Sequence, residues 1–182
     1  MRMSTRGRYA LRAMLDLALH NDEGPVLRHD IATRQELSAD YVAQLFQHLC
    51  AVELVRGVKG PGGGYLLARD PAAIRIGDIV RAVEGPIVAA QCATLDDQPT
   101  CHRAEGCTTR LLWVRLSEVM AQFLDAISLK ELCDQARQLD SGGAFSQHNT
   151  VETAGQLPSF NGHCALPAKE VGRAVHAYTY DI

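Results

Sequence analysis

The chain has 182 residues, 47% of them apolar and 5% aromatic, and its 18 Lys and Arg against 21 Asp and Glu give a net charge of −3. This length suits one or two small domains with a hydrophobic core. No run approaches the roughly 18 consecutive apolar residues that cross a bilayer, and the first residues lack the apolar stretch of a secretory signal. We therefore expect a cytoplasmic protein without a membrane segment, whose six cysteines are not disulfide-bonded.

The net charge hides an asymmetry along the chain. Residues 1–75 carry ten Lys and Arg and eight Asp and Glu, a net of +2, and residues 76–182 carry eight and thirteen, a net of −5, which together give −3. A second basic stretch, 54–69, contains no acid. This distribution fits two basic patches that face a phosphate backbone, although ordinary surface scatter would look similar. The arginines that precede the first acid are Arg2, Arg6, Arg8 and Arg12.

Three helices are predicted in the first 51 residues. Apolar residues at helical spacing predict helices at 6–20 and 27–35, separated by the turn residues 21–25. Ser38 occupies the N-cap position of a third helix, which continues to about Ala51. The inner face of that helix carries Val42, Leu45 and Leu49, and its outer face carries Tyr41, Gln44, Gln47 and His48. These outer side chains can donate and accept hydrogen bonds, as contacts to base edges in a DNA major groove require.

A glycine-rich hairpin is predicted next. Two short apolar runs, 55–58 and 65–67, flank the segment 59–64, which contains Lys59 and four glycines. The segment is not a phosphate-binding P-loop, because Lys and Ser or Thr do not follow its last glycine and no helix begins there. Three helices and then a basic hairpin are the order of a winged helix-turn-helix, in which the third helix enters the major groove and the hairpin tip reaches the backbone or minor groove. The alternative is a helical domain whose hairpin binds nothing.

Three cysteines lie in one predicted loop. Cys92, Cys101 and Cys107 follow the spacing C-x8-C-x5-C, with prolines and a glycine nearby and no helical period. Thiolates are soft ligands for iron–sulfur clusters and zinc, and zinc sites more often contain C-x2-C pairs, which are absent here. The spacing therefore favours a cluster, with zinc and redox-active or inert thiols as alternatives. Cys50 and Cys133 are interpreted as core or near-core thiols, and Cys164 as a tail residue.

A long apolar helix follows the cysteines. Residues 108–127 carry a wide apolar stripe, which suggests packing against the same helix of a second chain, with burial inside one chain as the alternative. A dimer would also match DNA half-sites related by a two-fold axis. The stretch 141–182, rich in small and polar residues, is predicted to be a flexible tail.

The segments 8–16, 37–41, 44–46 and 59–67, together with the three cysteines, resemble the IscR, NsrR and RirA group of bacterial transcriptional regulators, the Rrf2 family. The resemblance covers residues 1 to about 138. It implies a homodimeric, DNA-binding regulator whose loop holds an iron–sulfur cluster. The IscR type, which the sequence resembles most, controls cluster-assembly genes. Alternatives are a regulator of the same family that responds to nitric oxide or iron, or a metal-free regulator that acts through a protein partner.

The sequence departs from the IscR pattern at the cysteines. The first gap is eight residues instead of five, and Arg110 stands where the pattern has a histidine ligand three residues after the last cysteine. Arg cannot act as a neutral ligand, so the fourth iron ligand is open. We expect His102 there, with Glu105, Asp96, Asp97 or a group of the partner chain as alternatives. A 2Fe–2S cluster is favoured, and the longer gap keeps 4Fe–4S as an alternative. A further departure is Ala43, where the IscR pattern has an acidic residue.

The fold class predicted is thus mainly α with a small β-wing, a winged helix-turn-helix plus a long dimerisation helix. Its regions are a DNA-binding domain at 1–85, a cluster-binding loop at 86–107, a dimerisation helix region at 108–140 and the tail at 141–182. No set of catalytic residues stands in a plausible pocket, so we do not expect an enzyme. The residues expected to contact double-stranded DNA are Arg2, Arg8, Arg12, Arg28, Ser38, Tyr41, Gln44, Gln47, Lys59, Gly60, Pro61 and Gly62.

Overall fold

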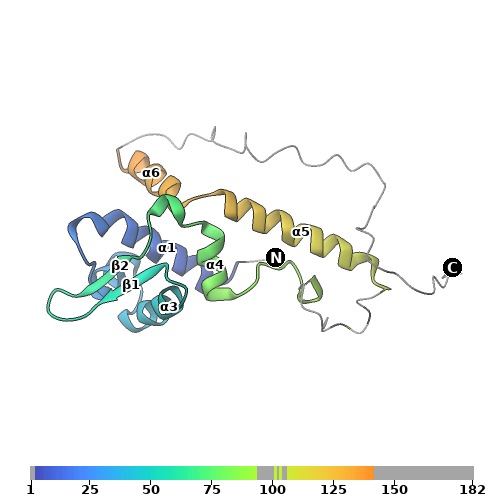
Figure 1. The fold of residues 1–182 in the computed structure, drawn as a ribbon, viewed down its shortest axis with the longest axis horizontal. Coiled ribbons are helices and arrows are strands. Elements are labelled where there is room, and N and C mark those ends of the chain that lie inside the picture. Colours follow the sequence, from blue (N-terminus) through green and yellow to red (C-terminus); the bar gives the residue numbers. More distant parts are fainter. Residues whose placement is uncertain (1–2, 94–100, 102, 104–105, 142–182) are drawn as a thin grey trace, which may run out of the picture. The chain divides into compact units, whose positions relative to one another are not determined.

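The computed structural model describes residues 3–93, 101, 103 and 106–141 (Figure 1). Arg2, His102, the other candidate ligands Asp96, Asp97 and Glu105, and nearly all of the predicted tail with Cys164 lie outside the described residues. The described elements are α1 (Thr5–His20), η1 (Asn21–Glu23), α2 (Arg28–Gln35), α3 (Ala39–Ala51), β1 (Val55–Val58), β2 (Gly64–Leu67), η2 (Pro71–Ala73), α4 (Ile76–Glu84), η3 (Gln91–Ala93), α5 (Thr108–Ala126) and α6 (Leu129–Asp140).

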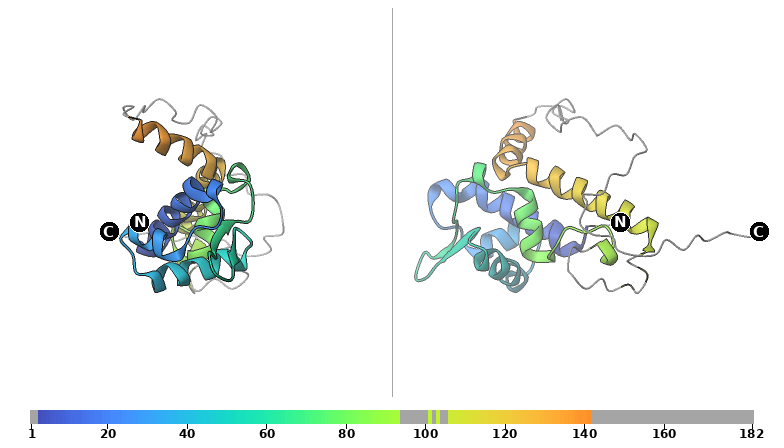
Figure 2. Two further views of the ribbon diagram at one scale, coloured as in Figure 1. Left: turned by 90° about the vertical axis from the view of Figure 1, so that its left-hand side faces the viewer. Right: turned by 45° about the vertical axis from the view of Figure 1, so that its right-hand side comes forward.

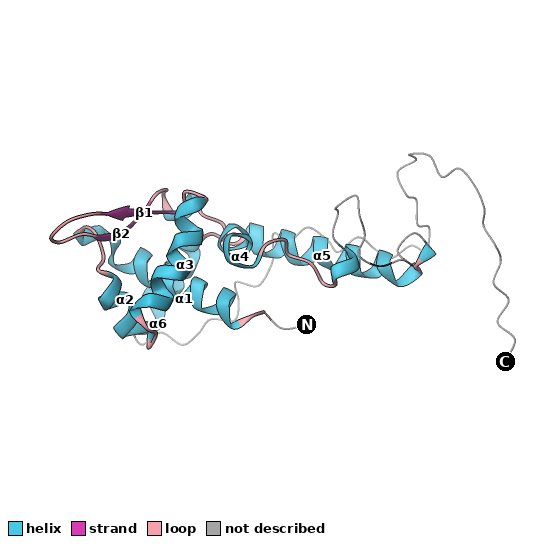
Figure 3. Ribbon diagram, turned by 90° about the horizontal axis from the view of Figure 1, so that it is seen from below, coloured by secondary structure: helices cyan, strands magenta, loops and turns pink. Residues whose placement is uncertain are grey.

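Helix ends follow local sequence signals. The Ser4 hydroxyl accepts a hydrogen bond from the Gly7 amide and caps α1, and the Ser38 hydroxyl accepts from the Tyr41 amide over 3.2 Å and caps α3. Helix α2 ends where Glu36 takes a left-handed backbone conformation with φ 57°. That residue turns the chain, so that only three residues separate α2 from α3 and the two helices form the predicted helix-turn-helix (Figure 3).

The core lies between α1, α3 and α4. Met14 and Leu17 of α1 are fully buried, as are Phe46 of α3 and Ile79 of α4. The predicted inner face of the third helix is confirmed, since Val42, Leu45 and Leu49 are all at most 1% exposed. The outer face of α3 is therefore held in a fixed direction by the burial of its inner face.

The predicted hairpin is also confirmed. Strands β1 and β2 pair antiparallel, with Val55 opposite Leu67 and Val58 opposite Gly64 (Figure 3). A backbone bridge from Val26 to Tyr65 attaches the hairpin to the segment before α2, and a side chain at Gly64 would overlap the Val26 carbonyl. The Tyr65 ring lies 4.5 Å from the Phe46 ring of α3. The wing is thus fixed to the same core as α3.

The predicted 108–140 region contains two helices with different contacts. The chain turns sharply between α5 and α6 (Figures 1 and 2), at an antiparallel bridge in which Ile76 N donates to Ile127 O over 3.0 Å and Leu129 N donates to Ile74 O over 2.9 Å. Helix α6 then packs on α1 and buries Leu129 and Cys133. The fold class is confirmed, while the four-region division stays a prediction. None of the described helices is long and apolar enough to cross a membrane.

Candidate DNA-binding surface and cysteine loop

The outer face of α3 presents polar side chains to solvent. Gln44, Gln47 and His48 are exposed, and Tyr41 is half-buried. The Tyr41 ring meets the Tyr9 ring of α1 edge-on, with 6.1 Å between the ring centroids. This contact restrains the tyrosine, so its hydroxyl is presented from a fixed position beside the exposed amides.

Exposed basic side chains lie on the elements that pack against α3. Arg8 on α1, Arg28 in the first turn of α2 and Lys59 at the wing tip are all exposed. Arg8 donates only to Thr5 of its own helix, over 3.3 Å, among the contacts found in the described part of the chain. Gly60 and Gly62 have φ values of 103° and 73°, a conformation that side chains rarely adopt, so the wing tip requires glycine at both positions.

Arg12 is arranged differently from these cations. Its Nε donates to Oε1 of Gln35 and its Nη2 donates to the Gln35 carbonyl oxygen, both over 3.0 Å. The guanidinium also lies 5.6 Å from the centre of the Tyr9 ring, within cation–π range. This predicted DNA contact is therefore bound to the last residue of α2 in the structure.

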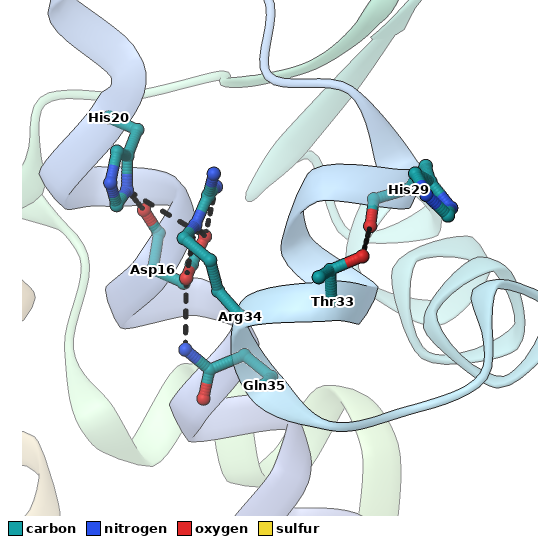
Figure 4. Close-up of polar contacts among 6 residues, drawn as sticks. All are labelled: Asp16, His20, His29, Thr33, Arg34 and Gln35. Carbon is teal, nitrogen blue, oxygen red and sulfur yellow. Dashed lines mark hydrogen bonds and ion pairs between the residues drawn. The ribbon is translucent and has the colours of Figure 1, made fainter.

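Next to Arg12 lies a buried carboxylate that the sequence analysis did not single out. Asp16 of α1 is 4% exposed, and both its oxygens accept from Arg34 at 2.6 to 3.1 Å (Figure 4). Gln35 Nε2 donates to Asp16 Oδ2 over 2.9 Å, and His20 Nδ1 lies 3.7 Å from Oδ1. The hydrogen bonds from Arg34 to the Asp16 carboxylate raise the pKa of Arg34. An aspartate between Leu15 and Leu17 in an apolar helix is the signal that could have revealed this network, because buried carboxylates need partners.

The cysteine loop is fastened to α5 at two points. Arg110 Nε, in the first turn of α5, donates to the Cys92 carbonyl oxygen over 2.8 Å. Two turns further along α5, the Ser117 hydroxyl accepts from the Ala89 amide over 2.8 Å and donates to the Trp113 carbonyl oxygen over 2.7 Å. Ser117 is 7% exposed. The segment around Cys92 therefore packs along α5, whose N-cap residue is Cys107.

The thiol of Cys107 differs from the core thiols. A hydrogen bond with the Thr109 hydroxyl, 3.1 Å from Sγ, is the main cause of a lowered pKa for Cys107, helped by the Arg110 amide and the Arg103 charge. Burial instead raises the pKa of Cys133 and of Cys50. Cys133 is buried and Cys50 half-buried, in keeping with their interpretation as core or near-core thiols.

The described residues contain no group of three His, Cys, Asp or Glu placed to hold a metal ion. One hydrogen bond joins the backbone of Cys92 to the side chain of Arg110, three residues after Cys107, and all three loop cysteines are half-buried and without a disulfide. Their chemistry fits a soft metal or cluster, and the lowered pKa of Cys107 favours its ligand form, the thiolate.

Helix α5 leaves part of its apolar stripe uncovered. Leu112 is 59% exposed and Phe123 is 49% exposed, and Leu111 and Val119 are also exposed. Leu112, Val119 and Phe123 are spaced at seven and four residues and share one side of the helix. Such a stripe is unusual on the surface of a monomer.

The profile of the Rrf2 family, described as an iron-dependent transcriptional regulator, matches residues 3–135. The chain belongs to the Rrf2 family. It is 42% identical over 154 residues to the HTH-type transcriptional regulator IscR of Klebsiella pneumoniae strain 342, covering 85% of this chain and 93% of that protein. The corresponding regulator of Escherichia coli O1:K1 is 40% identical over 156 residues, or 86% and 94% of the two chains.

Solved structures give the same family. The structure of IscR from T. potens has a TM-score of 0.62 and 36% identity, and the match covers 76% of this chain and 90% of that one. The structure of CymR, the global cysteine regulator of B. subtilis, has a TM-score of 0.59 and 35% identity over 74% and 97% of the two chains. The resemblance to the Rrf2 family is confirmed, and the chain is a transcriptional regulator of the IscR and Rrf2 type. Its homologues are transcriptional regulators and not enzymes, as expected.

Proposed function

We propose that this Rrf2 regulator is a homodimer that binds double-stranded DNA through α3 and the wing and senses through an iron–sulfur cluster, controlling cluster-assembly genes. The observation that carries the DNA surface is the exposed polar face of α3, together with the exposed basic residues on the elements that pack against it, α1, α2 and the wing. Ser38, Tyr41, Gln44 and Gln47 would lie in the major groove. Arg2, Arg8, Arg28 and Lys59 would contact phosphates, and Gly60, Pro61 and Gly62 would let the wing backbone approach the DNA closely.

The uncovered stripe of α5 supports the dimer. Packing Leu112, Val119 and Phe123 against the same helix of a second chain would remove their apolar area from water. An antiparallel or crossed pair of equivalent helices creates a two-fold axis, so the two α3 helices would face two half-sites about one DNA turn apart.

The loop supplies the cluster ligands. Cys92, Cys101 and Cys107 would hold the cluster, with His102 as the preferred fourth ligand and 2Fe–2S favoured over 4Fe–4S. When bound, the cluster supplies a centre whose presence or oxidation state depends on iron and redox conditions. Arg110 would not coordinate the cluster, but its hydrogen bond to the Cys92 carbonyl holds the Cys92 backbone against the first turn of α5, the helix that Cys107 caps.

The opposite end of α5 is fixed to the DNA-binding helices. Asp125 accepts two hydrogen bonds from Arg81 of α4, at 2.6 and 2.7 Å, and α4 packs on α1 and α3. A helix of 19 residues is roughly 28 Å long and stiff. A change in the conformation of the loop would therefore alter the packing of α5 against α5 of the second chain. This change would in turn alter the distance between the two α3 helices.

Iron and sulfide analysis of anaerobically purified protein, with its absorption spectrum, tests the cluster. We expect a coloured protein whose colour is lost when Cys92, Cys101 and Cys107 are all replaced by Ser. The matched control is Cys50→Ser, which changes a half-buried thiol outside the loop and should keep the colour. Colour retained in the triple variant would contradict the ligand assignment, and iron-free wild-type protein would favour the metal-free alternative.

DNA selection tests the interface. The wild-type protein should enrich one sequence from a randomised duplex library, and Gln44→Ala should weaken binding to that duplex by about tenfold. The control is Gln135→Ala, on an exposed position of α6, which should bind as the wild type does. Equal binding by the Gln44 variant and the wild type would remove Gln44 from the interface.

A further inference from the structure

The last turn of α2 is held to α1 by an unusual concentration of hydrogen bonds. Arg34 and Gln35, the last two residues of α2, both donate to the buried carboxylate of Asp16 (Figure 4). Arg12, one turn earlier on α1, donates to both the side chain and the backbone of Gln35. Because the Asp16 carboxylate is 4% exposed, loss of a donor from Arg34 or Gln35 would leave part of a buried polar group unsatisfied.

The position of this turn determines where α3 begins. Gln35 directly precedes Glu36, whose left-handed conformation reverses the chain, and Leu37 N returns a hydrogen bond to Ala32 O over 2.9 Å. Ser38, three residues after Gln35, is the cap of α3. A shift of Gln35 relative to α1 would therefore move the first turn of α3, which carries two of the proposed major-groove residues, Ser38 and Tyr41.

Arg12 also reaches α3 by a second route. Its guanidinium lies over the Tyr9 ring at 5.6 Å, and that ring meets the Tyr41 ring edge-on at 6.1 Å. Arg12 thus restrains α3 both through the turn before it and through the tyrosine beside it. To bind a phosphate, Arg12 would have to give up its hydrogen bonds to Gln35.

We propose, building on the DNA-binding function above, that Arg12 and Asp16 are positioning residues that set the sequence discrimination of α3 without contacting DNA. Arg12 acts through Gln35 and Tyr9, and Asp16 acts through Arg34 and Gln35. The Arg12 guanidinium is engaged by Gln35 and the Tyr9 ring, so its contribution to phosphate binding is small.

The test compares two duplexes, the one enriched by the wild-type protein from a randomised library and a shuffled duplex of the same composition, each across a range of salt concentrations. Arg12→Lys keeps the charge but lacks the planar, forked set of donors that binds Gln35. We expect its affinity for the selected duplex to fall by about tenfold, its affinity for the shuffled duplex to change by less than about twofold, and its salt dependence to match the wild type.

Two further variants make the comparison decisive. Arg8→Met removes an exposed, proposed phosphate contact from the same helix, and it should weaken binding to both duplexes alike and lower the salt slope by about one. Asp16→Asn should behave as Arg12→Lys does, provided that circular dichroism shows it folded; Arg12→Lys stands as the test if it does not. Wild-type binding of both duplexes by Arg12→Lys would overturn the positioning role, and a wild-type protein that enriches no sequence would overturn the proposed DNA-binding function itself.

Discussion

Nε of Arg110 donates a hydrogen bond to the carbonyl oxygen of Cys92 over 2.8 Å and ties η3 to the first turn of α5. Arg110 stands where the IscR pattern has a histidine, and in this chain its side chain contacts the backbone of Cys92. Ser117 makes a second attachment through the Ala89 amide. These two bonds attach the start of the loop, at Ala89 and Cys92, to α5, although Arg110 is not a ligand.

Replacement of Arg110 by Gln should loosen this attachment. The backbone amides of 87–93 should exchange hydrogen with solvent faster, because local opening no longer has to break the bond to Cys92 O. Arg115→Gln is the matched control, since Arg115 is exposed on the same helix and pairs only with Glu118 among the contacts found in the described residues. Hydrogen exchange followed by mass spectrometry measures the difference, and equal rates in the two variants would show that the Arg110 bond does not hold the segment.

Alkylation should distinguish Cys107 from the core thiols. The Thr109 hydroxyl and the Arg110 amide lower the pKa of Cys107, so at neutral pH a larger fraction of it is the reactive thiolate. Burial raises the pKa of Cys133 and also shields it. Iodoacetamide added to metal-free protein near neutral pH should modify Cys107 well before Cys133, as peptide mass analysis can show. Thr109→Val should slow the reaction of Cys107, and an unchanged rate would mean that the hydroxyl does not stabilise the thiolate.

Loss of the α3 cap should affect both stability and DNA binding. Ser38→Ala removes the acceptor for the Tyr41 amide, and we expect the free energy of unfolding to fall by about 1 kcal/mol. Ser128 caps α6 in the same way, through the Glu131 amide, but lies far along the chain from the proposed DNA surface. Ser128→Ala should therefore lose similar stability in urea unfolding and keep its affinity for the selected duplex. Equal affinities of the two variants for the selected duplex would show that the Ser38 cap does not contribute to DNA recognition.

Much of the fold is predictable from the sequence because its signals are local. Ser38 directly precedes a run of apolar residues at helical spacing and caps α3, and the wing forms where glycines separate two short apolar runs. The turn at Ile127 and Ser128 could not be predicted in this way, because the backbone bridge to residues 74–76 is a long-range contact. The same holds at the site. The third helix and its outer face follow from periodicity, whereas the engagement of Arg12 by Gln35 depends on how α2 packs on α1.

The junction between α4 and α5 should be sensitive to pH. Arg81 lowers the pKa of Asp125, so the ion pair stabilises the fold at neutral pH and the stabilisation is lost as the pH falls through this lowered pKa, below the ordinary carboxyl value of 3.8. Both side chains are about 40% exposed, so Asp125→Asn should cost at most ~1 kcal/mol near neutral pH. Urea unfolding at several pH values should show the wild type and the variant converging in acid. A constant difference at all pH values would mean that the carboxylate charge is not the cause.

Gly77 tests the same junction by steric means. A methyl group at this position would overlap the Asp125 carboxylate and approach Arg81, so Gly77→Ala should displace the ion pair. Because both of these side chains are about 40% exposed, the loss of stability should be at most ~1 kcal/mol. Gly57→Ala is the control, because a side chain there meets open space. Thermal unfolding of the two variants should differ by several degrees, and similar unfolding temperatures would mean that the junction tolerates the displacement.

The exposed stripe of α5 should decide the oligomeric state. Leu112→Glu and Phe123→Glu place a charge on side chains that are 59% and 49% exposed in the single chain, so neither should unfold it, but each would bury an unpaired charge in a dimer. Light scattering after size exclusion should give a dimer for the wild type and a monomer for both variants. Leu139→Glu is the control, since Leu139 is 47% exposed near the end of α6, outside the stripe, and its variant should stay dimeric. Dimers in all three variants would place the interface elsewhere, and then the spacing of the two α3 helices could not be set through α5.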